Sequence, residues 1–285
     1  MNLVSRDECQ RGFTLVELLV ALGIFLVITG AAFTLLGTSQ KNYQTESQVL
    51  TSFQEARLGL DQIVRDVNDA GYPPPIFFAS GSPLNSASSP FAWSPNYPTS
   101  SCQIDVGGGG NCTTATAGDT APGDFDLIIE TNPNPQDPAS TVSWIRYQLQ
   151  NTTPLPTLMR GVVNKSIGDP DASTAGVLVP FVQNVVNTQV VQNVANSLVA
   201  QYQAAYPSIF PGGAPVPIFS YTCDNSSPPP QTRACPLAIV ADNSPANIRD
   251  VMITLIVAAP LPDGITGRPR LVTLSGRGRR INPNQ

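Results

Sequence analysis

The sequence has no histidine among its 285 residues. This absence excludes Ser-His-Asp and Cys-His nucleophile systems and removes imidazole as a metal ligand. Walker-type and dinucleotide-binding glycine motifs are missing too, because the glycine run at 107–110 lacks a flanking Lys-Ser/Thr and a strand–helix context. We therefore expect no catalytic residue and no cofactor, and an enzyme anchored outside the cytoplasm is the least supported interpretation.

Charged residues are scarce as well. They make up only 12% of the chain, and the formal net charge of −5 gives no support for nucleic acid as a main partner. We expect the local cluster of arginines near the C-terminal end to lie on an exposed strand that resists edge-to-edge aggregation, or at a contact with another chain, in preference to a DNA site. This cluster consists of Arg268, Arg270, Arg277, Arg279 and Arg280.

The longest hydrophobic run extends from Phe13 to Leu36 and is apolar or small apart from three threonines and Glu17. These 24 residues, at about 1.5 Å each, can cross the ~30 Å hydrocarbon layer of a membrane. A carboxylate within such a segment costs roughly 2.5–3.5 kcal/mol on insertion scales, so residues of this kind usually have a partner. A plain single-span anchor explains the apolar length but leaves Glu17 unexplained.

The residues just before the run narrow its interpretation. Arg11-Gly12 is followed by Phe13-Thr14-Leu15-Val16-Glu17, which places the acid five residues after the glycine. This pattern resembles the class III signal of type IV prepilins and type II secretion pseudopilins. The resemblance implies that a membrane prepilin peptidase cuts between Gly12 and Phe13 and methylates the new amino group of Phe13.

The same resemblance implies that Glu17 pairs with the amino terminus of a neighbouring subunit. An α-amino group with a pKa near ~8 is largely cationic at neutral pH, and pairing two ions offsets the burial of each. We therefore expect Glu17 to be an assembly contact. The amine at Phe13 of the same chain lies within one helical turn, so an intramolecular pair is the alternative.

A helical pattern continues beyond the apolar run without a break. Polar residues such as Asp66 fall away from the apolar stripe, and Gly71 with the prolines at 73–75 ends the pattern. A single helix over 13–70 would be about 87 Å long. The stripe recurs at spacings of three and four and consists of Val49, Phe53, Ala56, Leu60, Ile63, Val67 and Ala70.

Three glycines in the apolar run, Gly23, Gly30 and Gly37, stand seven residues apart and share one helix face. Small residues allow membrane helices to approach one another closely. Two explanations of these glycines remain equally open. They form a packing groove for neighbouring subunits, or they are present because glycine is common in membrane helices.

Cysteine usage indicates disulfides. Cys9 lies in the leader, and the four cysteines of the mature chain form an even set, which is typical of proteins outside the cytoplasm. Three connectivities are possible, and we expect Cys102–Cys112 with Cys223–Cys235 because local loops close at the least entropic cost. Zinc is disfavoured because there is no Cys-x-x-Cys pair.

The remainder of the chain indicates a loop-rich β domain. It is rich in proline and glycine, and the Pro/Ser/Asn-rich regions 72–123 and 207–236 predict loops. Of the strand-like segments, we expect the first two to pair with each other and the last two to pair across Pro262-Asp263-Gly264. These segments are 125–130, 142–150, 158–160, 177–182, 185–191, 251–258 and 269–275.

Two pairs of aspartates in the head are candidate calcium ligands. Asp124 and Asp126 flank a phenylalanine, and Asp169 and Asp171 flank a proline. Neither pair has the spacing of an EF-hand, so we expect ordinary solvated loop carboxylates and no metal site.

The wider arrangement resembles minor pilins of the PilW type and the related J-type pseudopilins, with similar elements at 158–161, 179–185 and 247–255. The expected fold is α+β and pilin-like: a long N-terminal helix, membrane-spanning in its first half, packs on an antiparallel β-sheet head with long loops. The expected domains are a leader at 1–12, a transmembrane and filament-core helix at 13–36, an amphipathic continuation at 37–71 and a head at 72–285.

The resemblance implies a minor structural subunit of a type IV pilus. Its expected location is the bacterial inner membrane, single-pass with the head outside the cytoplasm, and then the filament. Its expected partners are prepilin peptidase and other pilin or pseudopilin subunits. A pseudopilin of a type II secretion system is the first alternative. A membrane-anchored adhesive module, whose ligand is held by regions 72–123 and 207–236, is the second.

Overall fold

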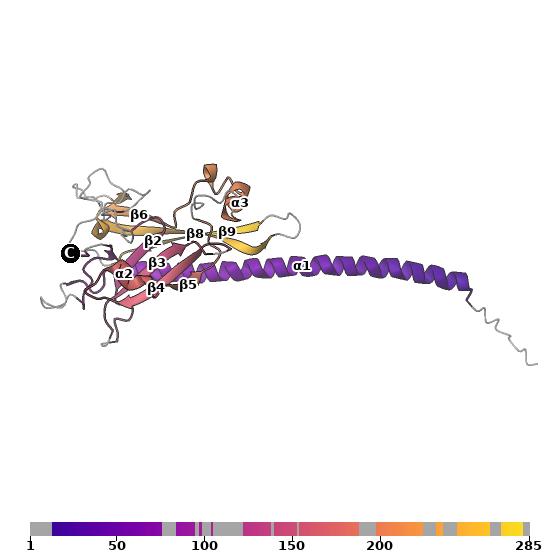
Figure 1. The fold of residues 1–285 in the computed structure, drawn as a ribbon, viewed down its shortest axis with the longest axis horizontal. Coiled ribbons are helices and arrows are strands. Elements are labelled where there is room, and N and C mark those ends of the chain that lie inside the picture. Colours follow the sequence, from indigo (N-terminus) through magenta and orange to yellow (C-terminus); the bar gives the residue numbers. More distant parts are fainter. Residues whose placement is uncertain are drawn as a thin grey trace, which may run out of the picture.

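The computed structural model describes residues 13–75, 84–94, 97–98, 104, 122–137, 140–152, 154–187, 198–224, 232–235, 244–262 and 269–281. One long helix projects far beyond a head that is built from two antiparallel sheets (Figure 1). The second half of the helix packs along the head. This arrangement confirms the α+β, pilin-like fold expected from the sequence.

The long helix is α1, Leu15–Asn68, and its 54 residues extend over about 81 Å. The predicted stripe is confirmed, because Ala56, Ile63 and Val67 are fully buried against the head. The helix ends two residues earlier than expected. Gly71 follows with a φ of 82°, a left-handed conformation that favours glycine, and turns the chain away.

The first sheet has the strand order β1-β2-β3-β4-β5. The predicted antiparallel pairing of its second and third strands is confirmed, with Asp126 opposite Gln148 and Thr131 opposite Ser143. The short helix α2, Pro170–Ala175, follows β4 in the chain. The strands are β1 (Phe91–Ala92), β2 (Asp126–Thr131), β3 (Ser143–Gln150), β4 (Thr157–Asn164) and β5 (Val179–Val182).

The second sheet has the order β7-β6-β8-β9. The predicted pairing of the last two strands is confirmed, and it runs from Asp250 opposite Arg279 to Pro262 opposite Pro269. The described residues of the head therefore form two sheets where one was expected. The strands are β6 (Phe219–Asp224), β7 (Thr232–Ala234), β8 (Ile248–Pro262) and β9 (Pro269–Arg279).

Both sheets share one hydrophobic core with the head-bound half of α1. Two glycines of β9 allow the helix to lie close to this strand. A Cβ atom on Gly278 would stand 2.5 Å from Cγ1 of Val67, and one on Gly276 would stand 3.0 Å from Cδ1 of Leu60. A smaller cluster lies under α3 (Leu198–Ala205), where Tyr202 and Phe210 pack with Ile256. The described residues also form two short 3-10 helices, η2 (Pro211–Gly213) and η4 (Pro245–Asn247).

The two predicted loop regions contain more buried structure than expected. In region 72–123, Phe91 of β1 is fully buried, and in region 207–236, Phe219 of β6 is fully buried. These strands are short and lie among prolines and serines, so local composition conceals them, while their apolar residues pack against distant segments. Of the expected strand 185–191, Val185 forms an isolated bridge with Val257, and residues 188–191 lie outside the described ranges.

Candidate assembly interface

The projecting half of α1 exposes an unbroken apolar surface. Fifteen large apolar side chains between Phe13 and Leu36 are at least half exposed, and Phe13 itself is 88% exposed. Burying a large apolar side chain stabilises by about 1.5–3 kcal/mol, so covering this surface is worth on the order of 20 kcal/mol or more. Within the described ranges, α1 is the one helix long and apolar enough to cross a membrane. This half of the helix therefore requires lipid or other helices around it.

The start of α1 holds Glu17 in a capping box. Thr14 is the N-cap residue, and its Oγ1 accepts the Glu17 N–H at 3.3 Å. The Glu17 carboxylate reaches back and accepts the Thr14 N–H at 2.9 Å and the Thr14 hydroxyl at 3.0 Å. This reciprocal arrangement satisfies donors that the first helical turn leaves without partners. The carboxylate is fully exposed in the single chain, so it remains accessible to a cation from outside.

The three glycines of the apolar run have no packing role within the head. Apart from the chain neighbours and the helix's own backbone, no described atom lies within 4 Å of the position that a Cβ would occupy at Gly23, Gly30 or Gly37. Gly59, on the head-bound half of α1, is different because its Cβ would stand 2.4 Å from Val182. The outer glycines therefore leave a shallow strip open on the exposed surface, which suits close approach of another helix.

Residues 9–33 match the family model described as the prokaryotic N-terminal methylation motif. This prepilin-type motif supports a type IV pilin-like protein. Proteins with this motif are processed by prepilin peptidase, and the matched residues include Gly12, Phe13 and Glu17. No curated protein and no solved structure matches the chain. The match ends within the projecting half of α1 and does not include the head.

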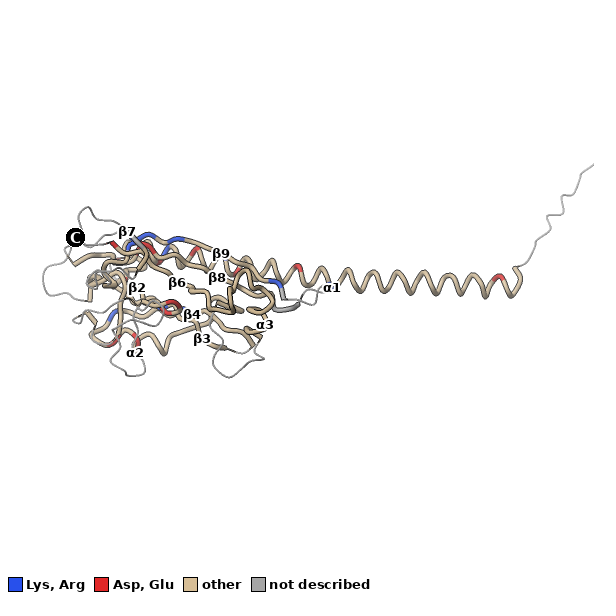
Figure 2. The backbone as a smooth tube through the Cα atoms, turned by 90° about the horizontal axis from the view of Figure 1, so that it is seen from above, with Lys and Arg blue, Asp and Glu red and all other residues tan. Residues whose placement is uncertain are grey.

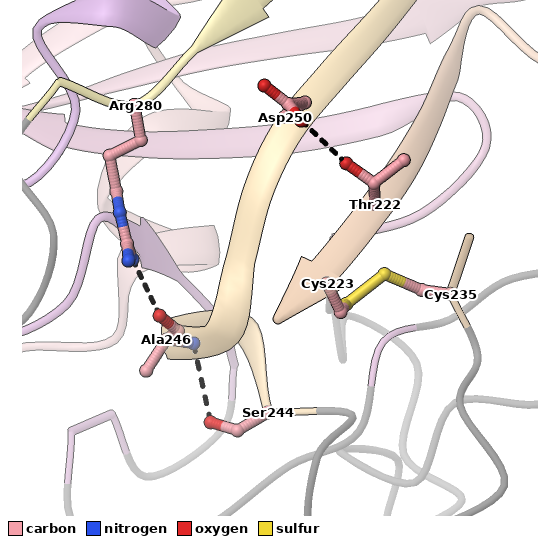
Figure 3. The surroundings of a disulfide bond; sticks show 7 residues. All are labelled: Thr222, Cys223, Cys235, Ser244, Ala246, Asp250 and Arg280. Carbon is pink, nitrogen blue, oxygen red and sulfur yellow. Dashed lines mark hydrogen bonds between the residues drawn. A yellow bond between two sulfur atoms is a disulfide. The ribbon is translucent and has the colours of Figure 1, made fainter. Parts of the chain in front are cut away.

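The structure tests some of the predicted site residues and not others. Cys223 and Cys235 form a disulfide with a Cα–Cα distance of 5.6 Å, as predicted (Figure 3). Cys102 and Cys112 lie outside the described residues, as does Gly12. The cleavage, methylation, assembly and packing roles stay predictions. Within the described ranges, no group of three or more acidic or cysteine residues is placed to hold a metal ion.

A buried charge network, which the sequence pattern did not indicate, ties α1 to the first sheet. Asp66 was expected to lie away from the core, but it is only 7% exposed. It accepts hydrogen bonds from the Tyr147 hydroxyl at 2.5 Å and from Arg160 Nη2 at 2.9 Å. Arg160 Nε also donates to the Tyr147 hydroxyl, at 2.9 Å. Burial, together with the neighbouring charge of Asp66, raises the pKa of Tyr147, so its hydroxyl stays a donor.

A second ion pair lies buried on the opposite face of the first sheet. Glu130 and Lys165 are in contact at 2.8 Å and almost completely inaccessible to solvent. The other carboxylate oxygen of Glu130 accepts the indole N–H of Trp144 at 2.9 Å. Lys165 also donates to the carbonyl of Ser86 and the hydroxyl of Ser88. Polar residues of the predicted loop 72–123 therefore complete a buried network.

The two aspartate pairs meet at a buried arginine. Arg146 of β3 pairs with Asp126 at 2.6 Å and with Asp171 at 2.5 Å, and its side chain is 2% exposed. Asp126 lies on β2 and Asp171 in α2, so the expectation of solvated loop carboxylates was wrong for these two. Asp169 caps the start of α2 by accepting the Asp171 N–H at 3.0 Å.

The distal end of the head carries the disulfide and part of the basic cluster. Figure 3 shows Arg280 directed at the carbonyl of Ala246, to which Nη1 donates at 2.6 Å. On the same sheet, Asp250 accepts the Thr222 hydroxyl at 2.9 Å and pairs with Arg277 at 2.5 Å. The arginines of the C-terminal end therefore stabilise the head as well as carrying surface charge.

Proposed function

We propose that this chain is a minor structural subunit of a type IV pilus, assembled into the filament through the projecting half of α1. In this proposal residues 1–12 are the leader, 13–36 the membrane and filament-core helix, 37–71 its amphipathic continuation, and 72–285 the head. The exposed apolar surface of 13–36 carries the proposal, because a helix of this kind is stable only in lipid or among other helices.

Assembly proceeds in two stages in this proposal. Prepilin peptidase cuts after Gly12 and methylates the amino group of Phe13, while the apolar helix holds the chain in the inner membrane with the head outside the cytoplasm. The helix then moves into a filament, where Glu17 accepts the amino terminus of a neighbouring subunit. Glu17 is already ordered by Thr14, so the pairing costs little side-chain entropy.

The assignment to a pilus, and to its minor components, rests on the size of the head and on its resemblance to PilW-type subunits. A pseudopilin of a type II secretion system is the alternative, because the N-terminal methylation motif is common to both kinds of subunit. The two differ in the machine that the subunit joins. Deleting the pilus assembly ATPase or the secretion ATPase in turn, and following incorporation of the chain into filaments, separates them.

The first test is intact mass and N-terminal sequencing of the protein isolated from its own membranes, with and without prepilin peptidase. We expect a start at N-methylated Phe13 that depends on the peptidase. Purified filaments are then probed for the chain. A mature protein that starts at Met1, or that is cut beyond Leu36, would contradict the proposal, as would its absence from every filament of the cell.

A further inference from the structure

Among the described residues, the backbone groups on the outer edge of β9 are unpaired along most of the strand. The Arg280 N–H donates to the Arg249 carbonyl at 3.1 Å, whereas the Arg279 N–H points the other way and donates to Oδ1 of Asn68 at 2.8 Å. Amides alternate sides along a strand, so every second amide before Arg279 also points away from β8. These outward amides belong to Leu271, Thr273, Ser275 and Arg277.

In the part of the chain that the structure describes, no backbone group pairs with these four residues on their outer side. The sheet order ends at β9, so no described strand lies beyond it. At the other end of this sheet β7 has three residues, and in the first sheet β1 has two and β5 four, whereas β9 has 11. An edge of this length is a template for pairing with another strand.

The outer face beside this edge is positively charged. Arg277 and Arg279 are 56% and 60% exposed, and one carboxylate, that of Asp250, pairs with the first at 2.5 Å and lies 3.7 Å from the second. Basic positions gather beside β7 and β9 in Figure 2. Because one acid faces two guanidinium groups, donors remain for acidic side chains on a neighbouring strand.

The inner side of the same edge is apolar. Val64 of α1 is only partly buried, and its Cγ2 lies 3.1 Å from the position that a Cβ on Gly276 would occupy. A strand added to β9 would therefore direct the side chains of one face toward the side on which Val64 lies and those of the other face toward the arginines. The edge thus has different chemical preferences on its two sides.

We propose that the outer edge of β9 binds an extended segment of another protein, with acidic residues at alternate positions and apolar residues between them. The segment forms main-chain hydrogen bonds with Thr273, Ser275 and Arg277, and its acidic side chains lie beside the two exposed arginines. A second copy of β9 fits less well, because it adds further arginines to the same face. This proposal does not depend on the pilus assignment.

The test uses the full chain in detergent micelles and two synthetic eight-residue peptides, one alternating Val with Glu and the other Val with Gln. Binding is followed by fluorescence anisotropy, and amide protection by hydrogen exchange. We expect the Glu peptide to bind about tenfold more tightly than the Gln peptide. We also expect it to slow exchange at the outward amides of β9 and to leave β6 and β4 unchanged.

Two variants separate edge pairing from general adhesion. Ser275→Pro removes an outward N–H without removing a bond to β8, so the fold is retained and binding of the Glu peptide falls at least about tenfold. Ser275→Thr is the matched control and binds as the wild type does. Arg279→Gln weakens binding about two- to fivefold, as expected for an exposed charge.

Several results would overturn the proposal. These are no binding of the Glu peptide, equal binding of the two peptides, protection of amides away from β9, or undiminished binding to Ser275→Pro. Thermal unfolding of each variant is recorded alongside, so that a loss of binding with a loss of fold is recognised. In that case Arg279→Gln, which leaves the backbone unchanged, decides the question.

Discussion

Asp66 of α1 accepts a hydrogen bond from the hydroxyl of Tyr147 of β3 at 2.5 Å, across 81 positions of the sequence. Arg160 of β4 completes the contact by donating to both residues. This network fastens the head-bound half of α1 to the first sheet. It therefore sets how the projecting half of the helix leaves the head, and with it how the head would stand on a filament.

Replacing Asp66 with alanine is expected to lower the free energy of unfolding by about 2–4 kcal/mol, because it leaves Arg160 and the Tyr147 hydroxyl without their acceptor. Chemical denaturation of the full chain in detergent measures the change. Asp61→Ala is the matched control, since this exposed acid lies on the same helix, and its effect should stay within about 0.5 kcal/mol. Equal effects of the two substitutions would show that the network contributes nothing.

The buried pair of Glu130 and Lys165 predicts a non-additive double mutant. Lys165→Met strands a fully buried carboxylate, and we expect it to cost about 3–5 kcal/mol. Adding Glu130→Gln removes that charge and keeps an acceptor for the Trp144 indole, so the double mutant should be more stable than Lys165→Met alone. Strict additivity in a double-mutant cycle of unfolding free energies would contradict this account.

Asp250 is predicted to make the fold less stable as the pH falls. Burial acts to raise the pKa of this carboxyl, but hydrogen bonds from Arg277 and Thr222 outweigh it and hold the pKa below its ordinary value. A depressed pKa stabilises the fold above the unfolded-state value of about 3.9, and this contribution is lost as the pH falls through the folded-state pKa. Wild type should exceed Asp250→Asn in stability at pH ~7, and the gap should close as the pH falls below about 4 and through the folded-state pKa. Denaturation at a series of pH values measures the gap, and a constant gap would argue against the pairing.

Periodicity predicted the parts of this molecule that depend on local sequence. The stripe ending at Ala70, the antiparallel pairing around Trp144 and the Cys223–Cys235 disulfide follow from spacing and loop closure, and the structure has all three. The buried polar contacts were missed because their partners lie far apart in the sequence. The residues around Asp66 in the sequence do not indicate that Tyr147 and Arg160 are its partners. The helical pattern alone predicts that an acidic residue outside the apolar stripe is exposed to solvent.

The glycines predict two different kinds of defect. Gly278→Ala would place a Cβ 2.5 Å from Val67 inside the head, and we expect a loss of about 1–3 kcal/mol in unfolding free energy. At Gly30 an added Cβ meets nothing described outside the helix's own backbone, and this residue lies outside the head, so Gly30→Leu should leave the head stable while incorporation into filaments falls. Ala32→Leu is its control, because two residues turn the helix by about 200° and move the added bulk to another face. Normal incorporation of Gly30→Leu into filaments would contradict a packing role for Gly30 between subunits.

Glu17 allows capping and assembly to be tested separately. In the single chain its carboxylate accepts both the amide and the hydroxyl of Thr14, so a substitution at either residue disturbs the same helix start. Thr14→Ala removes the hydroxyl and keeps the carboxylate charge. Glu17→Gln keeps an acceptor for the Thr14 amide and removes the charge.

If the role of Glu17 is to pair with the amino terminus of a neighbour, the two variants should differ in filaments and not in processing. Both should be cut after Gly12, as mass spectrometry of the membrane fraction will show. Thr14→Ala should enter filaments nearly as well as wild type, since capping is worth only ~1 kcal/mol. Glu17→Gln should enter poorly, because the neighbouring amine is left buried without a counter-ion. Quantitative immunoblots of sheared filaments against whole cells measure the ratio. Equal incorporation of Glu17→Gln and wild type would contradict the assembly role and show that the Glu17 carboxylate acts only in capping the helix.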